Sequence, residues 1–456
     1  MKTSIANYQA ALNTRIDEMV SACTRCGACV EVCPMPARSP VDASEPVGLI
    51  GDVTAALMRG AQGEPTDASD NASSWASVCS GTGSCISACP ESLNPRFMLA
   101  ALREMVKRER PLQTRRNAGR DQFKKMARGV RVLSRLQMPK PVMERLSPSS
   151  HPQRLAPADV VFYTGCNLLK TPHIGLTCLD VLDRLGRAYE VHGGSSSCCG
   201  IYQARAGDTD NSLRQSMRTL DQLAAANAPT TLSWCPTCQM QFSETMVPIR
   251  LAGGENTTSL ASMQMFPVYL AEHLAELTPH FRHAVPRRVA LYEHPGSPGV
   301  TEAVIALLQA IPELEVVTLP VERFGYAMGS LGALPEERKA YLARILRAAA
   351  AADVDTLAGV YHSDHREIVA HEPYWPYEIV NFMELIGASM GISHEDTFKR
   401  LKLMQDTDAI VAECADLIDA HSMDLDEVRE VVLADMLQDQ FLNPNPALHP
   451  DGTTAS

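Results

Sequence analysis

The chain has 456 residues, 45% of them hydrophobic, and a net charge of −12. This composition suffices for ordinary packed cores, and the length suggests about three domains. No apolar run reaches the roughly 18 residues of a membrane span, and Asn, Gln and Asp interrupt the apolar positions of residues 1–20, so we expect neither a spanning helix nor a secretory signal. Fourteen cysteines in such a chain are better explained as metal ligands than as disulfides, which predicts a cytoplasmic location.

Residues 23–34, CTRCGACVEVCP, carry the most specific motif of the chain. They read C-x2-C-x2-C-x3-C-P. Cysteines at this spacing bind an iron–sulfur cluster, and in proteins with two clusters the fourth cysteine ligates the other one. Cys33 therefore predicts a second motif elsewhere in the chain.

Residues 79–90, CSGTGSCISACP, match that second motif with one substitution, because Thr82 stands where a cysteine is expected. Crossed ligation predicts one complete [4Fe-4S] cluster, held by Cys23, Cys26, Cys29 and Cys89. It leaves the second cluster three thiolates, those of Cys33, Cys79 and Cys85. A neutral hydroxyl is a poorer iron ligand than a thiolate. We therefore expect a [3Fe-4S] cluster there; the alternatives are a [4Fe-4S] cluster with a non-cysteine ligand and no second cluster.

The charge of the chain is distributed unevenly. Residues 103–145 contain fourteen Lys/Arg and four Asp/Glu, a balance of +10, whereas residues 392–439 contain four and thirteen, a balance of −9. Apolar residues at helical spacing predict an amphipathic helix within the basic stretch, namely Phe123, Met126, Val130, Leu133 and Leu136. This helix either lies on a membrane surface or an acidic partner, or is a linker that packs on the chain's own acidic tail. Nucleic acid is not an expected partner, because the overall charge is negative and no aromatic platform accompanies the basic residues.

From about residue 158, short apolar runs alternate with helical patterns, which predicts an α/β fold. Five cysteines stand where predicted strands give way to loops: Cys166, Cys198, Cys199, Cys235 and Cys238. Ligands of open α/β sheets bind at the carboxyl ends of the strands, so these thiols predict a cofactor site. Zinc fits less well, because five thiolates exceed the four ligands of a tetrahedral ion. Cys178 and Cys414 are expected to be small core residues.

The pattern C-x31-CCG-x34-C-x2-C, from Cys166 to Cys238, resembles the cysteine-rich CCG domain of heterodisulfide reductase B-type subunits. The N-terminal part is similar to the C-type subunit of the same enzymes, an α-helical ferredoxin. The fused order matches the D-type arrangement and the iron–sulfur subunits of anaerobic glycerol-3-phosphate dehydrogenase and glycolate oxidase. The resemblance covers roughly residues 15–390. It implies that the five cysteines hold a noncubane [4Fe-4S] cluster at which a disulfide is reduced, with Cys198 and Cys199 as the catalytic candidates.

Members of this kind carry two CCG domains, and the sequence predicts a second frame without cysteines. Residues 288–296, RVALYEHPG, parallel residues 160–166, with Gly296 at the place of Cys166. Residues 323–325, Arg-Phe-Gly, occupy the CCG position, and Tyr361 and Asp364 occupy the last two cysteine positions. Nearby nitrogen and oxygen donors predict either a replacement metal site or a hydrated loop of a structural pseudo-domain: His362, Asp364, His365, His371 and Glu372.

The expected fold class is α/β, with an N-terminal α-helical ferredoxin domain, two Rossmann-like CCG repeats of which the second is degenerate, and a helical C-terminal tail. The expected divisions are a ferredoxin domain at 1–110, a basic amphipathic linker at 111–157, an intact CCG domain at 158–284, a CCG domain without cysteines at 285–390 and an acidic helical tail at 391–456.

The sequence contains no dinucleotide-binding GxGxxG after a strand, no P-loop and no serine nucleophile elbow, so no flavin is expected on this chain. We expect an iron–sulfur electron-transfer subunit that exchanges electrons with a flavoprotein dehydrogenase or a subunit like an electron-transfer flavoprotein. Contact with quinone at the inner face of the membrane is a further expectation from the basic helix. The alternatives are a disulfide reductase that acts directly at the CCG cluster and a zinc-bound assembly scaffold.

Overall fold

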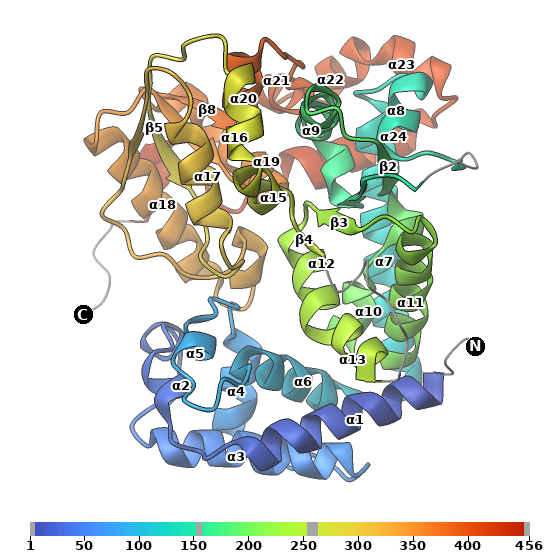
Figure 1. Ribbon diagram of the computed structural model, residues 1–456, viewed down its shortest axis with the longest axis vertical. Helices are drawn as coiled ribbons and strands as arrows, with labels where there is room; N and C mark the ends of the chain where they lie inside the picture. Colours follow the sequence, from blue (N-terminus) through green and yellow to red (C-terminus); the bar gives the residue numbers. More distant parts are fainter. Residues whose placement is uncertain (1–4, 152–156, 253–262, 451–456) are drawn as a thin grey trace.

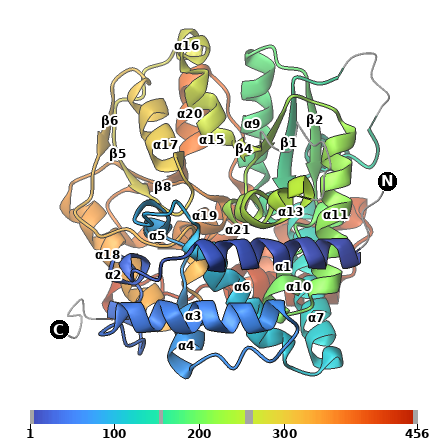
Figure 2. The ribbon, with the colours of Figure 1, turned by 60° about the horizontal axis from the view of Figure 1, so that its bottom comes forward.

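The computed structural model describes residues 5–151, 157–252 and 263–450. Its N-terminal part is helical and lies at the bottom of Figure 1. The helices are α1 (Ile5–Ala22), α2 (Ala28–Glu31), α3 (Pro46–Ala61), α4 (Asp70–Val78), α5 (Ser84–Ser87) and α6 (Pro95–Arg108). Figure 2 shows α1 and α3 side by side below the two sheets. The side chain of Asn94 starts α6 by accepting a hydrogen bond from the Phe97 N–H at 2.9 Å, and Pro95 fills the first helical position.

Two helices connect this part to the sheets, α7 (Leu112–Arg135) and α8 (Lys140–Leu146). The amphipathic prediction holds for α7, because Met126, Val130 and Leu133 are buried while Lys124 and Lys125 are exposed.

A first sheet has four parallel strands in the order β2-β1-β3-β4. Its strands are β1 (Val160–Gly165), β2 (Tyr189–Gly193), β3 (Thr230–Ser233) and β4 (Gln264–Met265). Its helices are α9 (Pro172–Arg184), α10 (Ile201–Ala206), α11 (Thr209–Ala225), α12 (Pro236–Met240), α13 (Val247–Ala252), α15 (Phe266–Glu272) and α16 (Leu274–Leu277). Strand β1 is buried throughout, as a central parallel strand covered on both faces must be.

A second parallel sheet has the order β6-β5-β7-β8. Its strands are β5 (Arg287–Tyr292), β6 (Leu314–Val317), β7 (Thr356–Gly359) and β8 (Glu378–Asn381). Its helices are α17 (Val300–Gln309), α18 (Pro335–Ala351), α19 (His362–Ile368) and α20 (Phe382–Met390). The two sheets lie beside each other above the N-terminal helices (Figure 1).

The two sheets have corresponding strand registers. The Trp234 N–H donates to the Tyr163 carbonyl at 3.2 Å, and the Val360 N–H donates to the Tyr292 carbonyl at the same distance. Cys235 and Tyr361 follow these donors and therefore occupy corresponding positions. Cys166 lies three residues after Tyr163, and the residue three positions after Tyr292 is Pro295. The counterpart of Cys166 in the second sheet is therefore Pro295, one residue before the Gly296 predicted from sequence.

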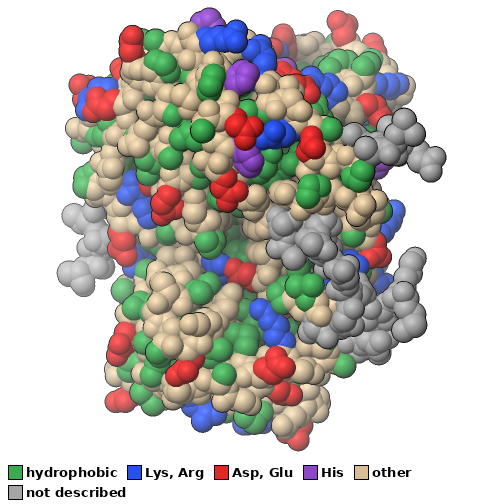
Figure 3. All heavy atoms as spheres, viewed as in Figure 1, with side chains coloured by type: hydrophobic (Ala, Val, Ile, Leu, Met, Phe, Trp, Pro, Cys, Tyr) green, Lys and Arg blue, Asp and Glu red, His purple; other side chains and the backbone are tan. Residues whose placement is uncertain are grey.

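The C-terminal tail is helical, with α21 (Thr397–Met404), α22 (Thr407–Glu413), α23 (Ala415–Ala420) and α24 (Leu425–Val431). Arg128 of α7 donates from Nη1 to Glu430 Oε1 of the tail at 2.7 Å, and Arg131 pairs with Glu427. The basic linker helix therefore packs on the chain's own acidic tail, one of the two arrangements expected for it. On the face in Figure 3, charged side chains of both signs are interspersed. No helix in the described ranges is long and apolar enough to cross a membrane.

Candidate metal centres

Four cysteines from the two N-terminal motifs line one cavity: Cys23, Cys26, Cys29 and Cys89. The first three lie around the start of α2, and Cys89 comes from the end of the second motif. Burial, together with the charges of Cys23, Cys26 and Cys89, raises the pKa of Cys29 to about 12. Four thiolates are thus unfavourable here without a positively charged group, and this donor set fits an iron–sulfur cluster.

A second cavity is lined by Cys33, Cys79 and Cys85 together with Thr82. Burial raises the pKa of Cys85 to about 12, with further contributions from Cys79 and Cys33. The indole N–H of buried Trp75 donates to Cys33 Sγ at 3.4 Å, which orients this sulfur. The two cavities group the cysteines across the two motifs, as crossed ligation requires, and Cys29 borders both cavities.

Thr82 occupies the position that Cys26 has in the first motif. Each residue precedes a glycine with positive φ, Gly27 at 86° and Gly83 at 90°, and each glycine starts a four-residue helix. Thr82 Oγ1 accepts a hydrogen bond from the Gly325 N–H at 2.8 Å and lies 3.0 Å from Ser80 Oγ. Thr82 therefore lines the cavity, and its hydroxyl is hydrogen-bonded to the loop after β6.

The five remaining candidate cysteines meet at the carboxyl ends of the first sheet. Cys166 follows β1, Cys198 and Cys199 lie between β2 and α10, and Cys235 and Cys238 flank the start of α12. Hydrogen bonds connect Cys166 with Cys198, Cys198 with Cys199, Cys199 with Cys238, and Cys238 with Cys235. Four of the five thiols are buried, and the fifth, Cys235, is half-buried.

These hydrogen bonds divide the thiols into two classes. Donation from Cys198 and Cys238 lowers the pKa of Cys199, and donation from Cys238 lowers that of Cys235. The pKa of a thiol that donates such a hydrogen bond rises instead. For Cys166, the hydrogen bond to Cys198 is the main cause of the raised pKa, and burial is the second. The site thus favours thiolates at Cys199 and Cys235, the form in which cysteine binds metal or attacks a disulfide.

Several residues that support this site were not identified from sequence. Tyr163 donates its hydroxyl to the Ser197 carbonyl at 2.7 Å and lies 3.6 Å from Cys238 Sγ. On α11, Ser216 Oγ donates to the Cys199 carbonyl at 2.7 Å and Thr219 Oγ1 donates to the Cys198 carbonyl at 2.8 Å. The available signal was a stripe of small polar residues on an otherwise apolar helix face, at Ser212, Ser216 and Thr219.

A half-buried arginine connects the five-cysteine site to the second sheet. Arg205 of α10 donates from Nη2 to the Tyr326 hydroxyl at 2.6 Å. The charge of Tyr326 is the main cause that raises the pKa of Arg205, with smaller contributions from Tyr202 and Cys199. The Tyr326 ring in turn packs on Gly81, where a Cβ would lie 2.5 Å from Cδ1 of the ring. A short series of contacts therefore joins the surroundings of Cys199 to the loop that holds Thr82.

Arg96 fixes the N-terminal helices against both sheets. Its Nη1 donates to the carbonyls of Gly81 at 2.7 Å and Gly296 at 2.6 Å, and its other nitrogens pair with Glu244. The Arg96 side chain is 4% exposed, so this cation is held by directed contacts and not by water.

The loop residues expected as a replacement metal site do not gather into one set. Asp364 Oδ2 lies 3.4 Å from His294 Nε2, and Glu372 pairs with Lys399. His371 Nδ1 contacts the Pro444 carbonyl at 3.3 Å. His365 turns to Asp396, at 2.6 Å. Because α19 directs neighbouring residues to different sides, closeness in sequence does not bring these donors together.

Comparison with protein-family models gives two matches. A 4Fe-4S dicluster domain matches residues 22–94, and a cysteine-rich domain, CCG, matches residues 160–243. The chain therefore contains a region that matches a dicluster ferredoxin domain, followed by a region that matches a CCG domain. This combination supports bound [4Fe-4S] clusters, iron–sulfur binding by the cysteine-rich domain, and a role in electron transfer. No curated protein gave a match to the chain.

Proposed function

We propose that this chain is the iron–sulfur subunit of an oxidoreductase complex and relays electrons between a flavoprotein and a noncubane cluster in the CCG domain. The observation that carries the proposal is the contact series between the two cysteine systems. Arg205 lies near Cys199 and binds Tyr326, and Tyr326 packs on Gly81 beside Thr82. The loop after β6 thus contacts Thr82 of the second ferredoxin site through Gly325, and it contacts Arg205, near the five-cysteine site, through Tyr326.

The proposed cofactors follow from the donor sets. Cys23, Cys26, Cys29 and Cys89 would bind a [4Fe-4S] cluster, and the three thiols near Thr82 a [3Fe-4S] cluster. The engagement of Thr82 Oγ1 by Gly325 and Ser80 supports the three-thiolate assignment, because the hydroxyl would have to exchange these contacts to bind iron. The noncubane type at the five cysteines rests on the resemblance to heterodisulfide reductases and on the presence of one thiol more than a cubane uses. When bound, such clusters supply one-electron carriers; the protein's residues position them and tune their charge.

We propose a flavoprotein as the electron partner in preference to quinone in a membrane. The basic helix α7 was the reason to consider a membrane surface, and two of its arginines are already paired with the tail. Arg128 contacts Glu427 and Glu430, and Arg131 contacts Glu427. These arginines are correspondingly less available to anionic lipid.

Direct disulfide reduction at the CCG site is the second candidate. It is favoured by hydrogen bonds from neighbouring thiols, which lower the pKa of Cys199 and Cys235 and so favour their thiolate forms. A disulfide would take up two electrons and two protons and leave as two thiols. The resemblance implies that the reference enzymes use two CCG clusters for this cleavage, whereas this chain has cysteines in one frame.

One experiment separates these functions. The anaerobic protein is reduced with a viologen and mixed with a flavin acceptor or with a panel of low-molecular-weight disulfides. The relay predicts rapid flavin reduction and no disulfide turnover, whereas thiol production that disappears in Cys198→Ala would establish the reductase. Protein that carries no redox-active iron would refute both.

A further inference from the structure

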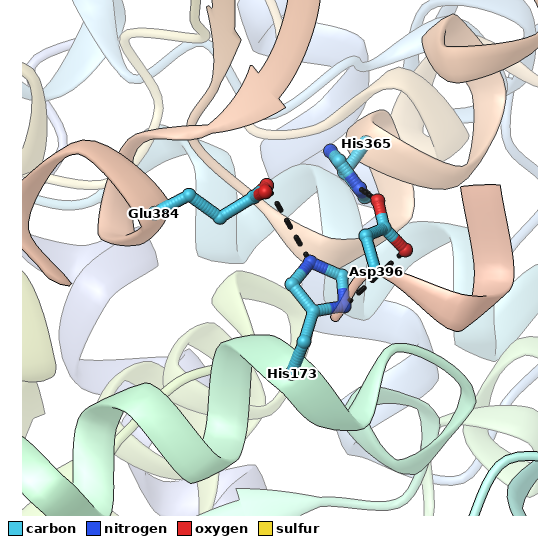
Figure 4. Close-up of side chains that lie close together, drawn as sticks. All are labelled: His173, His365, Glu384 and Asp396. Carbon is cyan, nitrogen blue, oxygen red and sulfur yellow. Dashed lines mark hydrogen bonds and ion pairs between the residues drawn. The ribbon is translucent and has the colours of Figure 1, made fainter. Parts of the chain in front are cut away.

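Four side chains of types that can ligate a metal lie close together between the two sheets, and none of them is a cysteine (Figure 4). His173 lies in the first turn of α9, beside the first sheet. His365 lies on α19 and Glu384 on α20, beside the second sheet, and Asp396 caps the start of α21. One ligand atom from each residue lies within 4.8 Å of the corresponding atoms of the other three.

The two imidazoles face carboxylates inside the protein. His173 Nδ1 lies 3.3 Å from Asp396 Oδ1, and His173 Nε2 lies 3.5 Å from Glu384 Oε1. His365 Nε2 lies 2.6 Å from Asp396 Oδ2. His173 is 1% exposed and His365 is fully buried, so water does not compensate for weak contacts.

The ring nitrogens of His173 lack good partners. Within the described part of the chain, neither of them makes a well-formed hydrogen bond, and neither does Nδ1 of His365. Leaving a buried polar atom unsatisfied costs about 1–3 kcal/mol. Nitrogens that lie within about 3.5 Å of carboxylates but outside good hydrogen-bond geometry are well placed to share an ion with them.

The carboxylates are held in position by backbone groups. The Asn381 N–H donates to Glu384 Oε1 at 2.6 Å, and the Lys399 N–H donates to Asp396 Oδ1 at 2.9 Å. The Lys399 ammonium is directed elsewhere, to Glu372 and the Ile379 carbonyl. Metal binding requires unprotonated imidazole nitrogens. With neutral imidazoles, the two ionised carboxylates leave a buried charge of −2, which one divalent cation balances.

We propose that His173, His365, Glu384 and Asp396 bind one divalent transition-metal ion, with Zn²⁺ as the preferred occupant, that fastens the first sheet to the second. Two imidazole nitrogens and two carboxylate oxygens are ligand types that zinc accepts, and their number matches the four-coordination that zinc prefers. The ion ties α9 to α19, α20 and the start of α21. Its ligands are nitrogen and oxygen, whereas the iron sites offer sulfur.

The test measures zinc in protein that retains its iron. Anaerobically purified protein is equilibrated with ZnCl₂, dialysed against metal-free buffer and analysed for both metals, and its zinc absorption edge is recorded. We expect about one zinc per chain with nitrogen and oxygen neighbours at about 2.0–2.1 Å and no sulfur at about 2.3 Å. Wild-type protein that retains no zinc, or zinc with sulfur neighbours alone, would overturn the proposal.

Two variants localise the ion. His173→Gln should lose the zinc and leave the iron content unchanged. Glu384→Gln retains an amide oxygen to accept from the Asn381 N–H and is therefore the milder change; it should weaken zinc binding at least about tenfold. His394→Gln is the control, because His394 contacts Asp180 at 2.7 Å and lies outside the cluster. Equal zinc retention in all three variants would refute the assignment.

Discussion

The most informative substitution is Thr82→Cys, which restores the missing fourth thiol of the second ferredoxin motif. If the three-thiolate site holds [3Fe-4S], the new thiol should recruit a fourth iron and raise the iron content by about one per chain. The oxidised-state EPR signal of the three-iron cluster should disappear, and a second reduced-state [4Fe-4S] signal should replace it. The exchange also removes the 2.8 Å hydrogen bond from the Gly325 N–H to Thr82 Oγ1, which should cost about 1 kcal/mol of stability.

Thr82→Val separates the two effects, because it removes the hydroxyl at nearly the same volume and adds no thiol. It should lower the urea midpoint much as Thr82→Cys does in the apoprotein, while leaving the three-iron signal in place. Iron content and EPR spectra of all three proteins, purified anaerobically side by side, provide the assay. If Thr82→Cys leaves the iron content and the spectra of the wild type unchanged, the three-thiolate assignment fails.

Three further predictions concern buried charges. Arg205→Gln removes a cation near Cys199 and should lower the reduction potential of the CCG centre by on the order of 50 mV. Arg205→Lys keeps the positive charge and should largely preserve this potential. An EPR-monitored redox titration that finds the same potential in both variants would contradict the role of charge. Arg96→Met removes the cation that pairs with half-buried Glu244, which keeps the hydrogen bond from Asn94 Nδ2 at 3.1 Å. The substitution should destabilise the docking of the N-terminal helices by about 3 kcal/mol, seen as faster proteolytic release of that part; unchanged proteolysis would argue against it. Burial is the main cause that lowers the pKa of His371 to about 3, so the folded protein keeps this ring neutral while the unfolded chain protonates it below its usual value of about 6.5. Stability should therefore fall as pH drops from about 6.5 towards 3, by up to about 1.4 kcal/mol per pH unit, and His371→Gln should reduce this slope in urea titrations; an unchanged slope would mean that the ring is protonated in the folded state.

The cysteine motifs could be interpreted from sequence because their chemistry is local. Spacing alone grouped Cys23, Cys26 and Cys29, and the requirement for crossed ligation added Cys89 from sixty residues further along the chain. The alternation of apolar runs and helical patterns likewise gave the parallel α/β class. In both cases the determining signal lies within a single element or a repeated motif.

The contacts that join the centres have no such signal. Arg205, Tyr326 and Gly81 belong to three separate elements, and only the packing of the second sheet against the N-terminal helices brings them together. The His173 cluster was missed for the same reason, since its members come from four elements. The neighbouring loop donors were grouped from their closeness in sequence, and the direction of each side chain on α19 then separated His365 from Asp364.

The three proposed clusters are tested together by the iron and acid-labile sulfide content of anaerobically purified protein, with EPR spectra before and after dithionite. Three bound clusters predict about eleven irons per chain, a three-iron signal in the oxidised state, a [4Fe-4S] signal in the reduced state and a third, separate signal that is lost in Cys198→Ala. Iron sufficient for the ferredoxin sites alone, with zinc bound by the five cysteines of the CCG domain, would contradict the three-cluster assignment.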